Sequence, residues 1–339
     1  MTARDLDILH SIVEEYIESG EPVASRTVSR LRSDGLSPAS IRNTMADLEE
    51  DGYLSQPHTS AGRIPTDKAF RSYVHSLASG RVLAAELHRL RHDLIQAVTM
   101  EARVQRSSHM LTEMTRSIGI AAAIPTSSQT LDQIELIGLA DNRVLMIVAT
   151  RDQMVRNKVV VLDDPIPQDE LASIRNYINR NFSGWMLSEV HSELRRRLEE
   201  QSAAYDAMLR KLNILYAKGL LEIGLSPEVH MEGASNLVGL DLHLTREKLR
   251  ELFRTLEEKK RIVQLLDRFL EQPGGEVAVQ VGLGDEHPSM CELSLIGISV
   301  TLPGGLSAKI AVLGPMRMDY GKAISAVRHM GQAFQSIQA

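Results

Sequence analysis

The sequence predicts an α+β protein of two or three domains. With 339 residues, the chain exceeds the usual size of a single hydrophobic core. Segments with helical apolar periodicity open the chain, and segments with strand-like alternation follow in its middle and its last third. The hydrophobic fraction of 43% and the charged fraction of 24% are those of an ordinary soluble globular protein.

The first 50 residues predict three helices. Residues 6–19 carry a one-sided apolar stripe that ends at Gly20, and Ser25 is expected to cap a short second helix. Ser37 and Pro38 mark the start of a third helix, because serine is a good N-cap and proline needs no amide hydrogen at the first position.

A hairpin and a fourth helix follow. Residues 53–56 and 63–65 have strand character, and the small polar residues between them suit a loop. Thr66 is expected to cap the next helix. Helix, helix, turn, helix and hairpin is the order of a winged helix-turn-helix, so residues 1–80 are predicted to be a winged helix domain.

The remainder predicts a long stalk helix and two mixed regions. Residues 82–118 are expected to form the stalk helix. Strands separated by turn dipeptides, and helices after them, are then expected at 133–139, 144–150, 155–162, 168–180 and 188–217. The last third predicts a helix capped at Thr245 that runs to 271, strands at 276–282, 292–301 and 306–313, and a final helix at 319–337.

The third helix carries the residues that could read DNA. Sequence readout in the major groove needs outward donors and acceptors near the N-terminus of a helix. Arginine can pair with guanine and asparagine with adenine, and the helix N-terminus suits a phosphate. A protein-binding helix with ordinary surface polar residues is the alternative. The candidate recognition residues are Ser37, Ser40, Arg42, Asn43 and Thr44.

The hairpin loop allows the same two interpretations, a DNA-contacting wing or a plain loop. As a wing, its hydroxyl groups, the close approach that Gly62 permits and the charge of Arg63 would contact the DNA backbone or the minor groove. The start of the second helix adds further backbone candidates. The predicted wing and backbone contacts are His58, Thr59, Ser60, Gly62, Arg63, Ser25 and Arg26.

Composition and motifs argue against other classes of function. The net charge of −6 gives no support to nucleic-acid binding, although residues 22–46 hold four arginines against one acid. No nucleotide-binding glycine loop, nucleophile elbow or zinc-ligand spacing is present, so neither an enzyme, a metal site nor a cofactor is expected. One cysteine allows no internal disulfide, and no apolar run approaches a membrane span, so a cytoplasmic location is expected.

Three segments carry a resemblance to a known family. Residues 37–49 (SPASIRNTMADLE) and 56–66 (QPHTSAGRIPT), with Gly20-Glu21-Pro22-Val23 and the run 314–320 (GPMRMDY), resemble the heat-inducible transcription repressor HrcA family. The resemblance spans essentially the whole chain, and the wing run is its most specific part.

The resemblance implies an architecture. It implies a winged helix head, a GAF-like α/β domain of the sensor type, and a dimerisation domain of antiparallel sheet and helices inserted into the GAF-like one. On this chain the expected parts are the head at 1–80, the stalk and first GAF-like part at 81–127, the insert at 128–203, and the remaining GAF-like part at 204–339.

The resemblance also implies a function. A homodimer would bind double-stranded DNA at an inverted-repeat operator, repress chaperone operons until heat shock, and depend on the chaperonin GroEL for its active form. The repressor would be cytoplasmic and nucleoid-associated. The rival hypothesis is a regulator whose GAF-like domain binds a small molecule, of a kind the sequence leaves unknown; an enzyme is the least favoured alternative.

Overall fold

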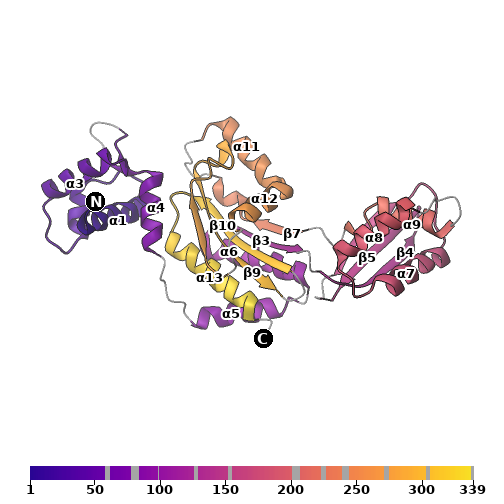
Figure 1. Ribbon diagram of the computed structural model, residues 1–339. Helices are drawn as coiled ribbons and strands as arrows, with labels where there is room; N and C mark the ends of the chain where they lie inside the picture. Colours follow the sequence, from indigo (N-terminus) through magenta and orange to yellow (C-terminus); the bar gives the residue numbers. More distant parts are fainter. Residues whose placement is uncertain are drawn as a thin grey trace.

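The computed structural model arranges the chain as three bodies in a row (Figure 1). We call them the head (residues 1–77), the central domain (84–125 and 227–336) and the insert (129–222). The structure describes residues 1–57, 62–77, 84–97, 99–125, 129–151, 155–200, 207–222, 227–238, 244–270, 275–302 and 306–336.

The head is a small helical domain with a two-stranded hairpin. Apolar residues at helical spacing in α1, among them Ile8, Leu9 and Ile12, are fully buried against the other helices. The elements of the head are α1 (Ala3–Ser19), α2 (Ser25–Leu31), α3 (Pro38–Glu50), β1 (Leu54–Ser55), β2 (Ile64–Pro65) and α4 (Asp67–Ser76).

Two expected caps of the head differ from the structure. Ala24, not Ser25, occupies the N-cap of α2, and no side chain caps that helix. Thr66 is at the N-cap of α4, but its hydroxyl donates instead to the carbonyl oxygens of Gly52 and Tyr53. The hydroxyl of Thr66 therefore joins the end of α3 to the start of α4.

The central domain is a five-stranded antiparallel sheet with helices on both faces (Figure 1). Residues alternate along each strand: Ile296 and Ile298 of β9 face α13, whereas Leu293 and Leu295 face α11 and α12. The strands, in sheet order, are β7 (Glu228–Glu232), β3 (Ile118–Pro125), β10 (Leu306–Pro315), β9 (Leu293–Leu302) and β8 (Ala278–Val281). The helices are α5 (Ala84–Ile95), α6 (Met100–Thr115), α11 (Arg246–Glu257), α12 (Lys259–Phe269) and α13 (Tyr320–Ser336), with short 3₁₀ turns at Ala234–Leu237 and Pro288–Met290.

The predicted stalk helix is wrong. Residues 84–115 form two helices, α5 and α6, and the second starts at Thr99, whose hydroxyl accepts from the amide of Ala102. Their apolar residues pack into the central domain; Leu94 and Leu111 are fully buried. The helix expected from Thr245 to 271 is likewise divided in two, at Glu258.

The insert has its own hydrophobic core. A three-stranded antiparallel sheet packs one face against three helices, with Phe182 fully buried between them. The chain leaves the central sheet after β3 and returns at β7, and these two strands are neighbours in that sheet. The elements of the insert are β4 (Leu131–Leu139), β5 (Arg143–Thr150), β6 (Val155–Val161), α7 (Gln168–Phe182), α8 (Leu187–Glu200) and α9 (Ala207–Ala217).

The end of the insert differs from the expected boundary at 203. Leu212, Leu215, Leu220 and Leu221 belong to the hydrophobic core of the insert rather than to that of the central domain. The insert therefore extends to about residue 222, because α9 is needed to cover the sheet.

The head docks on the central domain through α1 and α4. The rings of Phe70 and Tyr320 lie 6.0 Å apart, within one hydrophobic cluster that includes both bodies. The Arg317 guanidinium lies against Gly20, the C-cap of α1, and Arg71 Nη2 donates to the carbonyl of Val281 at 3.3 Å. We call this contact the head–central interface.

Two glycines with the same backbone conformation allow the contact of Arg317 with Gly20 to be tested separately from backbone strain. Gly20 and Gly52 both end helices at positive φ, +72° and +75°. In Gly20→Ala the new Cβ would lie 1.6 Å from Arg317 Nη1, whereas nothing lies within 4 Å of it in Gly52→Ala. Both variants should lose about 1 kcal/mol of head stability to left-handed backbone strain. Only Gly20→Ala should also speed hydrogen exchange in residues 316–320, and equal exchange in both variants would contradict the contact.

Candidate nucleic-acid interface

The turn between α2 and α3 is held by side chains. Ser29 Oγ donates to the carbonyl of Leu36 at 2.8 Å, which joins α2 to the residue just before the N-cap of α3. Arg32 pairs with Asp34 at 2.6 Å, and these hydrogen bonds lower the pKa of the Asp34 carboxyl. Gly35 takes the positive φ of +70° that the tight turn requires. These contacts therefore hold the start of α3 in place relative to α2.

The N-terminus of α3 is capped as its sequence predicts. Ser37 Oγ accepts from the amide of Ser40 at 3.1 Å, and the two hydroxyl groups lie 3.1 Å apart. Pro38 occupies the first turn. The exposed amides and the positive end of the helix dipole favour an anion at this end of the helix.

The faces of α3 are divided much as expected. Ile41, Met45 and Leu48 are buried, and Arg42 and Asn43 are exposed. Ser40 is half-buried beside the cap, where its hydroxyl meets that of Ser37.

Thr44 does not lie with the outward residues of α3. Its exposed fraction is 9%, because it lies next to Met45 on the inward side. Its hydroxyl is therefore not positioned to reach a base edge.

The wing is fastened to the head by backbone pairing. β1 pairs with β2, and Val23 exchanges both backbone hydrogen bonds with Arg63, at 2.8 and 2.9 Å. A Cβ at Gly62 would lie 2.3 Å from the carbonyl oxygen of Val23. Gly62 therefore permits close approach of the chain to Val23, which gives it a packing role that the sequence did not indicate. The candidate residues His58, Thr59 and Ser60 lie outside the described residues.

Arg63 connects the hairpin to α3. Its Nη2 atom lies 2.8 Å from Glu49 Oε2 near the C-terminus of α3, and its side chain is 19% exposed. This ion pair, together with the Val23 bridge, fixes the base of the wing relative to α3. Glu49 gave no such signal in the sequence, because on a helical wheel it lies between the buried and the exposed faces of α3.

The cations that could meet DNA lie on α2 and α3. Arg26, Arg30 and Arg42 are exposed and form no ion pair with any described residue. Ser25 is half-buried in the first turn of α2, beside the exposed Arg26. A surface of unpaired arginines beside a capped helix N-terminus can bind a polyanion.

Within the described residues, no group of histidine, cysteine or acidic side chains is arranged to hold a metal ion. No helix in the described part of the chain is long and apolar enough to cross a membrane.

The comparisons with protein families and with known relatives point to the same family. A family model described as the HrcA protein C terminal domain matches residues 101–324. The heat-inducible transcription repressor HrcA of Sorangium cellulosum is 33% identical, with all of this chain and 98% of that protein covered. The repressor of the same name from Geobacter sulfurreducens is 35% identical, over 96% of this chain and 95% of the relative.

The chain belongs to the HrcA family. The resemblance of the sequence to this family is thereby confirmed. A solved structure, described as a hypothetical protein at 2.2 Å resolution, shares the overall fold with this member of the family: its TM-score is 0.63, at 20% identity over 99% of both chains.

A half-buried histidine is expected to make the stability of the HrcA head depend on pH. Burial lowers the pKa of His10, which packs edge-on against Tyr73 and whose Nε2 has no partner among the described residues. The neutral form is favoured in the folded head, so this contribution to stability is present above about pH 6.5, the usual pKa of histidine, and is lost as pH falls through the lowered value.

The expected outcome is that the wild type loses more stability than His10→Gln between pH 8 and pH 5. Hydrogen-exchange protection of the α1 amides measures the difference. Parallel losses in the two proteins would show that His10 does not titrate in this way.

Proposed function

We propose that this HrcA-family chain is a sequence-specific transcription repressor of heat-shock genes that binds an inverted-repeat operator as a homodimer. The observation that supports it most is α3: a capped N-terminus, with the exposed side chains of Arg42 and Asn43 beside it, on a helix whose other face is buried. Membership of a family of transcription repressors supports the same proposal.

The proposed base contacts come from two residues. Asn43 is suited to pair with adenine and Arg42 with guanine, because both side chains are exposed near the start of α3. Ser37 and Ser40 are proposed to hold a phosphate at the helix N-terminus, with Ser25 and Arg26 on the adjacent backbone. Thr44 is left out because it is buried.

The wing is proposed to contact the backbone or the minor groove through His58, Thr59, Ser60 and Gly62. Arg63 is given two roles: its charge attracts phosphate, and its ion pair with Glu49 sets the position of the wing. Because neither role depends on base sequence, Arg63 should matter as much for scrambled DNA as for the operator.

The insert offers the surface for the second copy. The face of its sheet turned away from the helices carries apolar side chains that are aligned across the strands: Ile137, Leu145 and Val159 stand in one row of paired residues. Val155 and Val161 extend the patch, and each is more than half exposed. A contiguous apolar face on a soluble protein usually marks an interface.

A second copy fits this face better than an unrelated partner would. A sheet can stack on an identical sheet about a two-fold axis, so the same apolar patch covers itself: if one residue of the patch contacts a second residue on the other copy, the reverse contact also forms. The same two-fold axis relates the two heads, and an operator that matches two symmetric heads must be an inverted repeat.

Regulation is proposed from the family resemblance. Heat would release the dimer from DNA if its active and inactive states differ by only a few kcal/mol, since a small difference lets temperature change their populations. The chaperonin GroEL is proposed to maintain the active form, and the repressor to act in the cytoplasm at the nucleoid. Refolded protein should then bind more operator in the presence of chaperonin than in its absence.

A gel-shift titration at fixed salt tests the function. It compares the inverted repeat found upstream of chaperone genes with a single half-site and with a scrambled duplex. Binding to the full repeat at least ~10³-fold tighter than to scrambled DNA is expected for a specific dimeric repressor. Equal binding to all three duplexes, with chaperonin present, would refute the proposal.

Two substitutions test the recognition helix in the same assay. Arg42→Ala and Asn43→Ala should each weaken operator binding by about 1–3 kcal/mol, with little effect on scrambled DNA. Glu50→Ala is the matched control, since Glu50 is exposed on the same helix but lies at its C-terminal end. If Asn43→Ala bound the operator as tightly as Glu50→Ala does, α3 would not be the reading element.

Val159→Lys tests the dimer surface. A lysine at this half-exposed position would place two positive charges in the apolar interface, so the dimer dissociation constant should rise at least ~10-fold, or about 1.4 kcal/mol. Ser173→Lys introduces the same charge on the exposed side of α7 and should leave the dimer unchanged. Sedimentation equilibrium measures both. A monomeric wild type, or a dimer unaffected by Val159→Lys, would exclude this face.

A further inference from the structure

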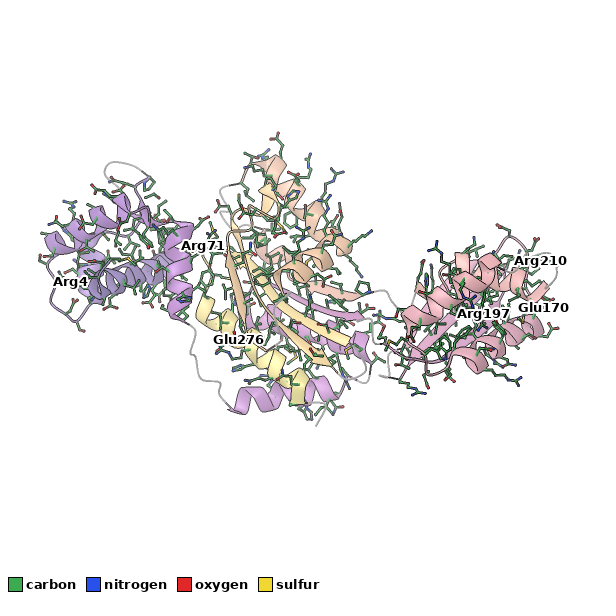
Figure 2. All side chains as sticks on the ribbon, viewed as in Figure 1. Arg4, Arg71, Glu170, Arg197, Arg210 and Glu276 are labelled. Carbon is green, nitrogen blue, oxygen red and sulfur yellow. The ribbon has the colours of Figure 1, made fainter. Side chains whose placement is uncertain are left out.

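A cavity of about 530 Å³ lies at the head–central interface. One wall is α4 of the head, and the others are the strand β8 with the residues before it and the helix α13 (Figure 2 labels Arg71 and Glu276, one from each side). Its volume falls within the range of small-molecule sites. Its lining side chains are Arg71, Val74, His75, Glu276, Val277, Val279, Val281, Ile324 and Arg328.

The cavity continues the docked face of α4. Asp67 and Phe70 lie against Gly282 and Tyr320, so the first half of this face touches the central domain directly. Arg71, Val74 and His75 follow one turn later on the helix and line the cavity, where Arg71 also reaches the Val281 carbonyl. The head and the central domain are thus in contact at one end of α4 and separated by open space at the other.

The apolar part of the cavity comes from both bodies. Val74 is half-buried on α4, Val277 and Val279 are half-buried on the opposite side, and Val281 and Ile324 are buried behind them. These branched side chains form a surface on which a small apolar group can pack.

The charged part of the cavity is mainly cationic. Arg71 and Arg328 supply two guanidinium groups, and the imidazole of His75 lies nearby, against the single carboxylate of Glu276. Arg71 is exposed and donates a hydrogen bond to the Val281 carbonyl, and among the described residues no carboxylate pairs with it. An Arg71 guanidinium in this state keeps most of its donors for an anion.

The backbone of β8 adds polar groups on the same side. β8 is an edge strand, and within the described residues it pairs only with β9. Alternate residues of such a strand direct their N–H and C=O groups away from the sheet. The Val281 carbonyl points away from the sheet, because it accepts a hydrogen bond from Arg71. The backbone groups of Val279, two residues earlier, therefore point to the same open side.

We propose that this cavity is a binding site for a small amphipathic carboxylate, with the carboxylate held by Arg71 and Arg328 and the apolar body packed on the valines. Such a ligand would touch the head through α4 and the central domain through β8 and α13. The assignment rests on the cavity, its charges and the edge strand, and it does not depend on the proposed DNA-binding function.

The test is a ¹⁹F NMR titration of the full-length protein with 6-fluoro-2-naphthoate. Its neutral amide, 6-fluoro-2-naphthamide, has the same apolar body and no charge. The carboxylate should bind at least ~10-fold tighter than the amide. Equal binding of the two probes, or no binding of the carboxylate, would overturn the proposal.

Three variants identify the site. Arg71→Gln should weaken naphthoate binding at least ~10-fold, because it removes the guanidinium, whereas Glu276→Gln should tighten binding because it removes the opposing charge. Both residues are exposed, so neither substitution disturbs a core. Arg180→Gln makes the same change as Arg71→Gln on the exposed face of α7 and should have no effect. Naphthoate binding that is the same in Arg71→Gln as in Arg180→Gln would place the ligand elsewhere and overturn the assignment.

Discussion

The arrangement of this molecule depends on the packing of Phe70. This residue of α4 is 2% exposed; its ring lies 6.4 Å from that of Tyr16 in the head and 6.0 Å from that of Tyr320 in the central domain. It therefore belongs to the core of the head and to the head–central interface at once. Tyr320 is in turn held by hydrogen bonds to Ser294 and to the carbonyl of Met316, and burial raises the pKa of its hydroxyl. Loss of this one contact would affect the stability of the head and its orientation together.

A second constraint explains how the chain can carry the insert. β3 and β7 are neighbours with a continuous antiparallel register, in which Gly119 faces Glu232 and Ala123 faces Glu228. The two points where the chain leaves and re-enters the central sheet are therefore close in space. Because the insert has a core of its own, the central sheet can form its remaining contacts without it. This separation suits an arrangement in which one body binds a second copy and another positions the DNA-binding helix.

The sequence predicted the local structure of α3 well, because the signals there are local. Ser37, Pro38 and the spacing of Ile41, Met45 and Leu48 determine a capped amphipathic helix without help from distant residues. The exposure of Thr44 was predicted wrongly. A residue at the border of the apolar stripe can be covered by other parts of the fold, which the periodicity of one helix does not show. The packing role of Gly62 was missed for a similar reason: the chain that it approaches is at Val23, some 40 residues earlier.

The division of the longer helices could be predicted only in part. Thr99 followed by Glu101 is a helix-start signal, so the break between α5 and α6 was present in the sequence, although the apolar periodicity obscured it. The break at Glu258 has no such signal, because the residues around it are good helix formers. At Glu258 the break follows from tertiary packing: Leu252 and Leu256 before it, and Ile262 and Leu266 after it, all pack in one core against the sheet. The docking role of the run 314–320 also depended on the folded structure, because Arg317 and Tyr320 meet residues of the head that are far away in sequence.

The contact of Arg317 with the end of α1 has a consequence for the length of the DNA site. The head is held against the central domain by side-chain contacts of Arg317, Tyr320 and Arg71. In a dimer built this way, the separation of the two α3 helices is a fixed dimension of the folded protein. Since DNA turns once in about 10.5 base pairs, a change of a few base pairs between half-sites would turn one of them away from its helix. The length of the spacer between the half-sites would then be as much a part of recognition as the bases that are read.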